Sequence, residues 1–136
     1  MTEALKSAVR TIANNCCEYC RSQGEFSHDP FSGEHIFPVV KGGTDDLDNL
    51  AWSCLGCNYY KFTAISVFDL VTSKPAPLFN PRIDSWETHF RWHEDFTTII
   101  GLTPTGRATI TRLKLNRQGL INLRQVLYDA GKHPPK

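Results

Sequence analysis

Four cysteines stand in two Cys-x2-Cys pairs, Cys17 with Cys20 and Cys54 with Cys57. One such pair presents two thiolates from a single tight turn, and two pairs supply the four ligands of a tetrahedral zinc ion. The sequence therefore predicts a structural zinc site made of these four residues. The alternative is four buried free thiols, which behave as small apolar groups. Cys16 is left over and is interpreted as a packed thiol, because a site that uses Cys16 with Cys20 needs a wider turn.

The 33 residues between the two pairs are more than a simple zinc ribbon needs, so we expect them to fold outward as a unit of their own. This unit contains Glu34 and His35, and Asn58 follows its end. A neutral imidazole accepts a proton from water at neutral pH, which makes His35 a candidate general base. Carboxylate and amide oxygens suit Mg²⁺, which keeps several waters, so Glu34 and Asn58 are candidate ligands of a divalent cation.

Together these groups match what hydrolysis of a phosphodiester requires. The base deprotonates a water in line with the leaving 3′ oxygen, and the cation stabilises the charge that develops there. Lys61, one helical turn after Asn58, is predicted to bind phosphate, with a merely solvated side chain as the alternative. A lone histidine in a strand is usually structural, but a histidine that follows a glutamate between two cysteine pairs favours catalysis.

The segment GEHIFPVVKGGTDDLDNLAWSCLGCNYYK resembles the HNH endonuclease family, whose fold is the ββα-metal finger. The shared features are an acidic residue and His before I-x-P, a Gly-Gly turn, D-N-L, and C-x2-C-N-x2-K, and the likeness covers Cys17 to Lys61. The later stretches LFNPRIDSWETHFRW and GLTPTGRATITRLKLN also resemble the region after the nuclease core in one bacterial branch of that family.

The resemblance implies that double-stranded DNA is the substrate, with the hairpin at the minor groove. It also gives Asn49 a catalytic-site role, which is to fix the loop between the two strands by hydrogen bonds and so orient His35. Two positions depart from the usual pattern. Asn58 replaces the final His, which favours Mg²⁺ or Mn²⁺ as cofactor, and Glu34 stands where Asp is more usual, which shifts the metal by one methylene.

Hydrophobic spacing predicts the elements that must position these residues. A helix over 3–13 precedes the first cysteine pair, strands over 34–40 and 50–52 form the hairpin, and a helix follows from Cys57 to about Ala64. The prolines between Thr72 and Pro81 indicate an extended surface connection.

Further along, residues 89–94, 97–102 and 107–114 are predicted as strands of a small antiparallel sheet, the last two joined by a turn at 103–106. Asn116 is predicted to cap a terminal helix that stops before Gly131.

The predicted fold class is therefore α+β: a ββα-metal finger stapled by a four-cysteine zinc site, followed by a small C-terminal antiparallel sheet and a terminal helix. The length, 136 residues, suits one domain. We expect a single HNH nuclease domain over 1–136, with its zinc-stapled catalytic core at 17–64 and a basic C-terminal extension at 80–136.

Composition and charge limit the class of protein, its location and its binding partners. The chain is 40% hydrophobic and 21% charged, which is typical of a soluble globular protein, and it has no apolar run of about 18 residues that could span a bilayer. It also has no secretory signal at its start, so we expect a cytoplasmic protein with reduced thiols. The net charge is only +1, but the segment from Gly101 onward contains seven basic residues and a single acidic residue, Asp129. This excess predicts a phosphate-binding face, with a basic solvated surface as the alternative.

The leading hypothesis is a metal-dependent DNA endonuclease that nicks or cleaves with a His general base and one divalent cation. The competing class is a zinc-knuckle nucleic-acid-binding protein without cleavage activity, which has no need of Glu34, His35, Asn49 and Asn58 together. A third class is an interaction protein that uses zinc only to fold. The sequence does not indicate the oligomeric state.

Overall fold

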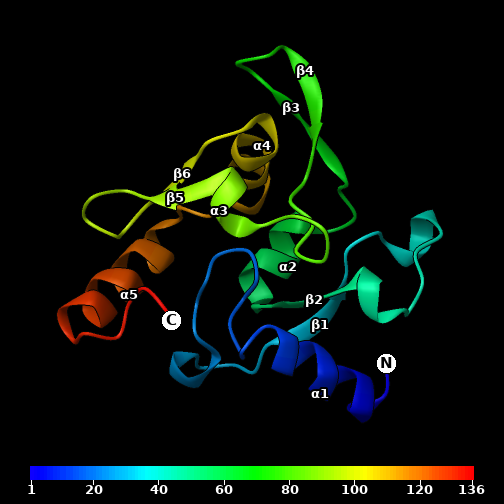
Figure 1. Ribbon diagram of the computed structural model, residues 1–136, viewed down its shortest axis with the longest axis horizontal. Coiled ribbons are helices and arrows are strands. Elements are labelled where there is room, and N and C mark those ends of the chain that lie inside the picture. The colour runs from blue at the N-terminus through cyan, green and yellow to red at the C-terminus, as the bar shows by residue number, and fades with distance from the viewer.

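The computed structural model describes residues 1–136 as a mixed α+β fold with three separate two-stranded antiparallel sheets (Figure 1). The strands are β1 (Ser32–His35), β2 (Leu50–Ser53), β3 (Ser66–Asp69), β4 (Lys74–Pro77), β5 (Phe90–Trp92) and β6 (Ile99–Gly101), paired in sequence order. The α-helices are α1 (Glu3–Ile12), α2 (Leu55–Lys61), α3 (Trp86–His89), α4 (Pro104–Leu113) and α5 (Gln118–Asp129). Short 3-10 turns cover Gly24–Phe26, Val39–Lys41 and Leu47–Asn49.

The predicted N-terminal helix is present as α1. Its first turn is capped by Thr2, whose hydroxyl accepts a hydrogen bond from the Leu5 amide at 3.1 Å. Val9 is fully buried, and α1 packs against the β1–β2 hairpin. In Figure 1 the helix lies along the outer side of that hairpin.

The β1–β2 hairpin and α2 form the predicted ββα unit, with shifted boundaries. β1 stops at His35 rather than Val40, and Val39–Lys41 is a 3-10 turn, because Pro38 has no N–H with which to extend the ladder. The helix α2 begins two residues earlier than predicted, because Cys54 acts as its N-cap: its Sγ accepts a hydrogen bond from the Cys57 amide. In the register of the hairpin, His35 faces Leu50.

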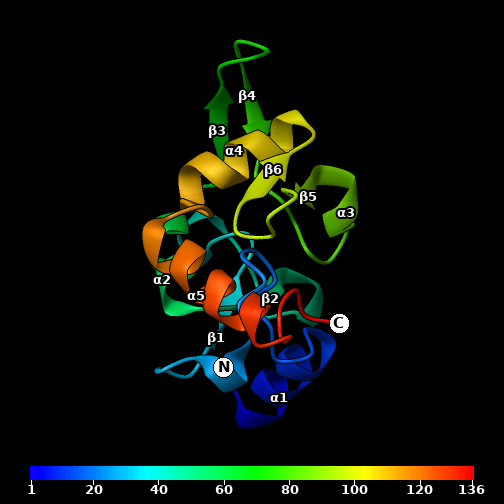
Figure 2. The same cartoon turned by 90° about the vertical axis from the view of Figure 1, so that its left-hand side faces the viewer.

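The proline-containing connection predicted over 72–81 is partly a strand. β4 pairs with β3, and Asp69 lies opposite Lys74. Proline is tolerated here because a two-stranded ribbon leaves one edge of each strand unpaired. Figures 1 and 2 both show this hairpin projecting from the body of the molecule.

The strand predicted over 107–114 is wrong, because this segment is the helix α4. Thr103 is its N-cap, with a hydroxyl that accepts a hydrogen bond from the Gly106 amide at 3.0 Å, and Pro104 occupies the first turn. Proline fits that position since the N–H it lacks would have no intrahelical partner. The Thr-Pro pair therefore starts a helix here instead of making a turn between strands.

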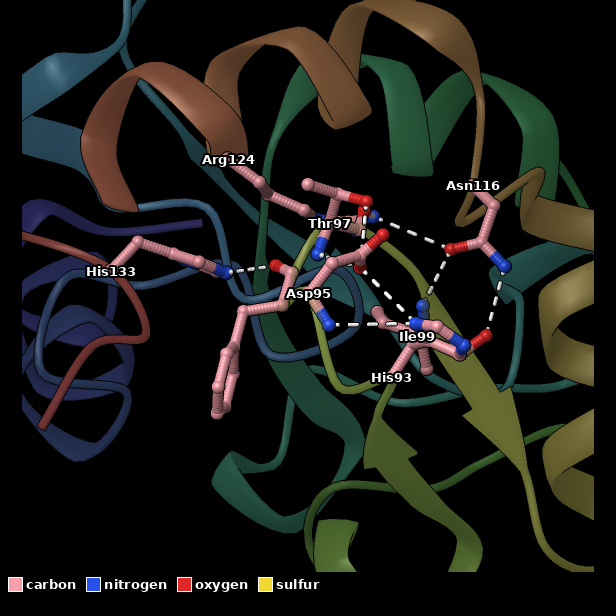
Figure 3. Close-up of polar contacts among 8 residues, drawn as sticks. His93, Asp95, Thr97, Ile99, Asn116, Arg124 and His133 are labelled. Atoms are coloured by element: carbon pink, nitrogen blue, oxygen red, sulfur yellow. Dashed lines mark hydrogen bonds and ion pairs between the residues drawn. The ribbon is translucent and has the colours of Figure 1, made fainter. Parts of the chain in front are cut away.

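The predicted capping role of Asn116 is also wrong. The residue that precedes α5 is Arg117, and it makes no side-chain capping bond. Asn116 instead reaches across to β6, where its Oδ1 accepts from the Ile99 amide at 2.7 Å and its Nδ2 donates to the Ile99 carbonyl at 2.9 Å (Figure 3). Arg124 of α5 donates to the nearby Thr97 carbonyl at 2.9 Å, so α5 is fastened to the β5–β6 hairpin.

The buried core runs through the whole molecule and includes the four paired cysteines. It joins apolar residues of α1, β2, the second and third hairpins, α4 and α5, whereas the residues of β1 are only partly buried. The terminal helix α5 contributes Leu120 to this core, whereas its Val126 is largely exposed. No helix of the structure is both long enough and apolar enough to cross a membrane.

A buried ion pair fastens the first cysteine turn to the later part of the chain. Glu18 lies between Cys17 and Cys20, and its carboxylate accepts hydrogen bonds from the Trp52 amide, at 2.8 Å, and from the Arg82 guanidinium. Only 9% of each charged side chain is exposed. Removal of one partner from such a pair leaves a buried charge uncompensated.

We therefore expect Glu18→Gln and Arg82→Met each to lower the free energy of unfolding by about 3 kcal/mol, which is typical for breaking a buried ion pair. The double variant should lose less than the sum of the two, because the pair is already broken in each single variant. Urea unfolding of the zinc-loaded protein measures both effects. Glu25→Gln, which changes an exposed carboxylate, is the matched control; strictly additive losses would contradict the pairing.

Candidate functional site

The four paired cysteines converge on one point in the interior. Their Sγ atoms all lie within 4.8 Å of one another, and those of Cys20 and Cys54 are 3.7 Å apart. A tetrahedral zinc ion with Zn–S bonds of about 2.3 Å would hold its sulfurs about 3.8 Å apart. The donor set, which we call the four-cysteine cluster, therefore fits zinc in both chemistry and spacing.

Cys16 takes no part in this cluster. Its thiol is buried and points to the Asn14 carbonyl at 3.5 Å, which agrees with the interpretation of Cys16 as a packed thiol. The residues that build the cluster come from two short turns: Cys17 and Cys20 follow α1, while Cys54 and Cys57 open α2. The cluster thus fixes the start of α2 against the turn after α1.

An arginine that the sequence analysis did not single out lies against the cluster. Arg117 directs its guanidinium nitrogens at Cys54 Sγ, 3.5 Å away, and at Cys57 Sγ, 3.7 and 3.8 Å away. Its remaining hydrogen bonds go to the Leu113 and Lys114 carbonyls. A side chain on Gly56 would meet this guanidinium, since a Cβ there would lie 2.5 Å from Arg117 Nη2. Glycine at position 56 leaves the room that Arg117 occupies.

Arg124 is a second buried arginine near the cluster. It donates to the Cys20 carbonyl at 3.3 Å and to the Leu115 carbonyl at 2.7 Å, and only 3% of the residue is exposed. Arg107 likewise forms a bidentate ion pair with Asp69, in which Nε and Nη2 each donate to a carboxylate oxygen at 3.0 Å. Three of the seven basic residues after Gly101 are therefore already engaged with other groups of the protein. The predicted phosphate-binding face has correspondingly fewer free charges.

Glu34 is half-buried on β1. Its Oε1 accepts a hydrogen bond from the Ser32 hydroxyl at 2.8 Å. Burial raises the pKa of the Glu34 carboxyl, while the Ser32 hydrogen bond and the charges of His35 and Lys61 act in the opposite direction. Only Oε1 accepts a hydrogen bond within the protein, so the carboxylate keeps a free oxygen, which is the ligand chemistry that a divalent cation prefers.

His35 ends β1, and its ring is 27% exposed. Its Nε2 lies 2.6 Å from Oδ1 of Asp45, a residue of the loop between β1 and β2. Asp45 is not among the residues predicted for the site, and the one signal for it in the sequence is its place in the Gly-Gly-Thr-Asp-Asp run. The hydrogen bond to His35 lowers the pKa of the Asp45 carboxyl. The imidazole is therefore both reachable from solvent and held in orientation.

Asn49 joins the two ends of the same loop. Its Oδ1 accepts from the Phe37 amide at 2.8 Å, and its Nδ2 donates to the Phe37 carbonyl at 3.0 Å and to the Thr44 carbonyl at 2.8 Å. The chain approaches itself so closely here that a Cβ on Gly43 would collide with the Phe37 carbonyl. These contacts hold the loop that carries Asp45 next to the end of β1.

Asn58 and Lys61 lie three residues apart on α2, at neighbouring positions of the helix surface. Lys61 is only 3% exposed, and its Nζ donates to the Ile36 carbonyl at 3.0 Å and to the His35 carbonyl at 3.4 Å. This placement fits neither the predicted phosphate contact nor a solvated side chain, because the ammonium is used to hold the end of β1 on α2. Asn58 is half-buried, and no hydrogen bond joins its side chain to Glu34 or His35.

The other histidines lie outside this site. The ring of His89 contacts the Thr103 hydroxyl at 2.6 Å, and that of His93 lies 3.3 Å from Asp95. His133 is buried and contacts the Phe96 carbonyl through Nε2 at 2.8 Å (Figure 3). None of them belongs to a cluster of metal-binding side chains.

Comparison with known proteins gives one finding. Residues 17–61 match the model of the HNH endonuclease family, from the first zinc cysteine to Lys61. No curated protein and no solved structure matches the chain. The matched segment contains the whole four-cysteine cluster, the hairpin and α2. Residues 17–61 therefore form a segment similar to the HNH endonuclease family, with a four-cysteine cluster consistent with its zinc-knuckle-containing branch.

Proposed function

We propose that this chain is a metal-dependent endonuclease that hydrolyses phosphodiester bonds of DNA, nicking or cleaving double-stranded DNA with His35 as general base. The observation that carries the proposal is the hydrogen bond between His35 and Asp45 beside the half-buried carboxylate of Glu34. It supplies an oriented base on the residue that follows Glu34, a carboxylate whose only hydrogen bond within the protein comes from Ser32. Binding of nucleic acid without cleavage, the competing function, requires neither feature. The cytoplasmic location and the single-domain organisation over 1–136 remain predictions.

The hydrogen bond to Asp45 selects one form of the imidazole. A carboxylate only accepts, so the neutral ring donates its Nε2 hydrogen to Asp45 and keeps the lone pair of Nδ1 free. Nδ1 makes no hydrogen bond within the protein and is the atom that would take the proton of the attacking water. After the proton arrives, the charge of Asp45 stabilises the imidazolium. Asp45 thus positions the base. Asn49 holds the loop that carries Asp45, and Lys61 holds the end of β1, where His35 lies.

Glu34 and Asn58 are the residues that would hold the catalytic cation, which we expect to be Mg²⁺ or Mn²⁺. When bound, such an ion supplies positive charge for the leaving oxygen and for a non-bridging phosphate oxygen. The raised pKa of Glu34 means that the ionised carboxylate is poorly stabilised by the protein alone. A cation beside it relieves that deficit, which favours binding of the metal at this place.

Cys17, Cys20, Cys54 and Cys57 would hold a structural Zn²⁺, and the charge of the site explains the nearby arginine. Four thiolates around one Zn²⁺ leave a net negative charge in the interior, which is costly without compensation. Arg117 reaches Cys54 and Cys57 from outside the segment matched to the HNH family. Its N–H groups stabilise the thiolates by charge-assisted hydrogen bonds.

We expect His35→Ala to lower the rate of metal-dependent plasmid nicking by on the order of 10²-fold or more, because the general base is lost. Agarose-gel assays with Mg²⁺ or Mn²⁺, and with chelator, measure the rate. His28→Ala is the matched control, since the His28 side chain is 98% exposed and lies outside the site. Equal cutting by His35→Ala and the wild-type protein would contradict the role of His35 and indicate a contaminating nuclease or a different base.

We expect Asp45→Asn to lower the turnover number by about 10-fold or more, as is common when an orienting partner is changed. The asparagine side chain no longer stabilises the imidazolium. The affinity for DNA and the zinc content should stay as in the wild type, which separates positioning from a folding defect. Asp48→Asn, an exposed acid of the same loop without a hydrogen bond to His35, should leave turnover unchanged. Full activity of Asp45→Asn would argue that the His35–Asp45 contact has no part in catalysis.

We expect Arg117→Met to release zinc roughly 10-fold faster to a chromogenic chelator, in line with losses seen on changing residues that support metal ligands. The methionine fills similar space without N–H groups for the thiolates. The conservative change Arg117→Lys should release zinc at an intermediate rate. Arg91→Met removes an exposed arginine of β5 and serves as the control; release from Arg117→Met at the control rate would refute the role of Arg117.

A further inference from the structure

A groove of about 670 Å³ lies between α2 and the end of α4 and adjoins the proposed active site. In Figures 1 and 2 these two helices lie next to each other, and they are in contact. The residues that line the groove, which we call the α2–α4 groove, are Asn58, Tyr59, Tyr60, Phe62, Arg112 and Lys114. Asn58 is one of the two proposed ligands of the catalytic cation, so whatever fills the groove lies beside the scissile phosphate.

Two aromatic side chains of the groove face solvent. Tyr59 is 76% exposed and Phe62 is 72% exposed, although the opposite side of α2 is packed on the four-cysteine cluster. Phe62 also has a φ of 48°, a conformation that a bulky residue rarely adopts. Neither ring packs in the core. Their exposure beside the proposed active site therefore indicates a ligand with an aromatic or apolar surface.

The charged side chains of the groove are both positive. Arg112 and Lys114 line it at the end of α4, and no carboxylate does. Lys114 Nζ lies 4.8 Å from the centre of the Tyr60 ring, which places a cation against an aromatic face. An apolar protein segment would leave these two charges without partners. Exposed rings next to free cations suit single-stranded nucleic acid, whose bases stack on aromatic side chains while its phosphates contact Lys and Arg.

We propose that the α2–α4 groove binds unpaired nucleotides next to the scissile phosphate, with bases stacked on Tyr59 and Phe62 and phosphates on Arg112 and Lys114. In a continuous duplex the base faces are covered by neighbouring base pairs, so these rings gain such partners only where the strand is unpaired. The inference rests on the proposed nuclease function and names the substrate class within it. DNA with single-stranded stretches, flaps or branches is bound in preference to an uninterrupted duplex.

The test measures binding apart from cleavage. In the cleavage-deficient His35→Ala background, zinc-loaded protein is titrated with fluorescein-labelled single strands of about 20 nucleotides and with the matching duplex, and anisotropy gives the affinities. We expect Tyr59→Ala and Phe62→Ala each to weaken binding of the single strand by about 10-fold, the usual size of one lost base stack, with less than about 2-fold change for the duplex. Tyr59→Phe should keep the affinity, since it preserves the ring. Phe68→Ala, an exposed ring on β3 away from the groove, is the control.

Several outcomes overturn the inference. These are an absence of single-strand binding, an unchanged affinity of Tyr59→Ala, or an equal loss for duplex and single strand. Loss of self-association in Tyr59→Ala with DNA affinity intact would assign the groove to a second copy of the chain. Failure of the nuclease proposal looks different: the wild-type protein then binds the single strand through Tyr59 and Phe62 but cuts no DNA in any metal.

Discussion

The convergence of four thiols on one point is the interaction on which the rest of the structure depends. Each strand of the first hairpin has four residues and α2 has seven, and elements this short are not stable alone. The cluster joins the turn after α1 to the start of α2, and Cys54 serves at once as a member of the cluster and as the N-cap of α2. The direction of α2, and with it the position of Asn58 and Lys61, follows from this junction.

The part of the chain outside the matched segment completes this junction. Arg117 lies against two of the thiols, Arg124 donates to the Cys20 carbonyl, and Arg82 neutralises Glu18 within the first cysteine turn. Three of the nine basic residues after residue 80 are therefore used at the four-cysteine cluster and the turn around it. In physical terms the segment matched to the HNH family and the C-terminal extension share one electrostatic core, since buried charges require partners wherever these occur in the sequence.

The proposed active site depends on contacts that fix backbone rather than on a rigid sheet. Asn49 closes the loop after His35, Lys61 holds the end of β1 on α2, and Asp45 orients the ring of His35. These three side chains leave the ring partly open to solvent, as a base that must reach a substrate requires. The exposed groove beside Asn58 then extends the same surface over α2, so that chemistry and recognition have one short helix in common.

The sequence alone determined the features that depend on local spacing: the four-cysteine cluster from the two Cys-x2-Cys pairs, the first hairpin and helix, α1 from its apolar period, and the α+β class. It failed for residues 107–114, where a Thr-Pro pair that suits both a turn and a helix start was resolved only by packing against β6 and β3. Asn116, Asp45, Lys61 and Arg117 likewise acquired their roles from partners 10 to 63 residues away. A side chain's type limits the bonds that it can make, but only the tertiary structure decides which distant group comes within reach.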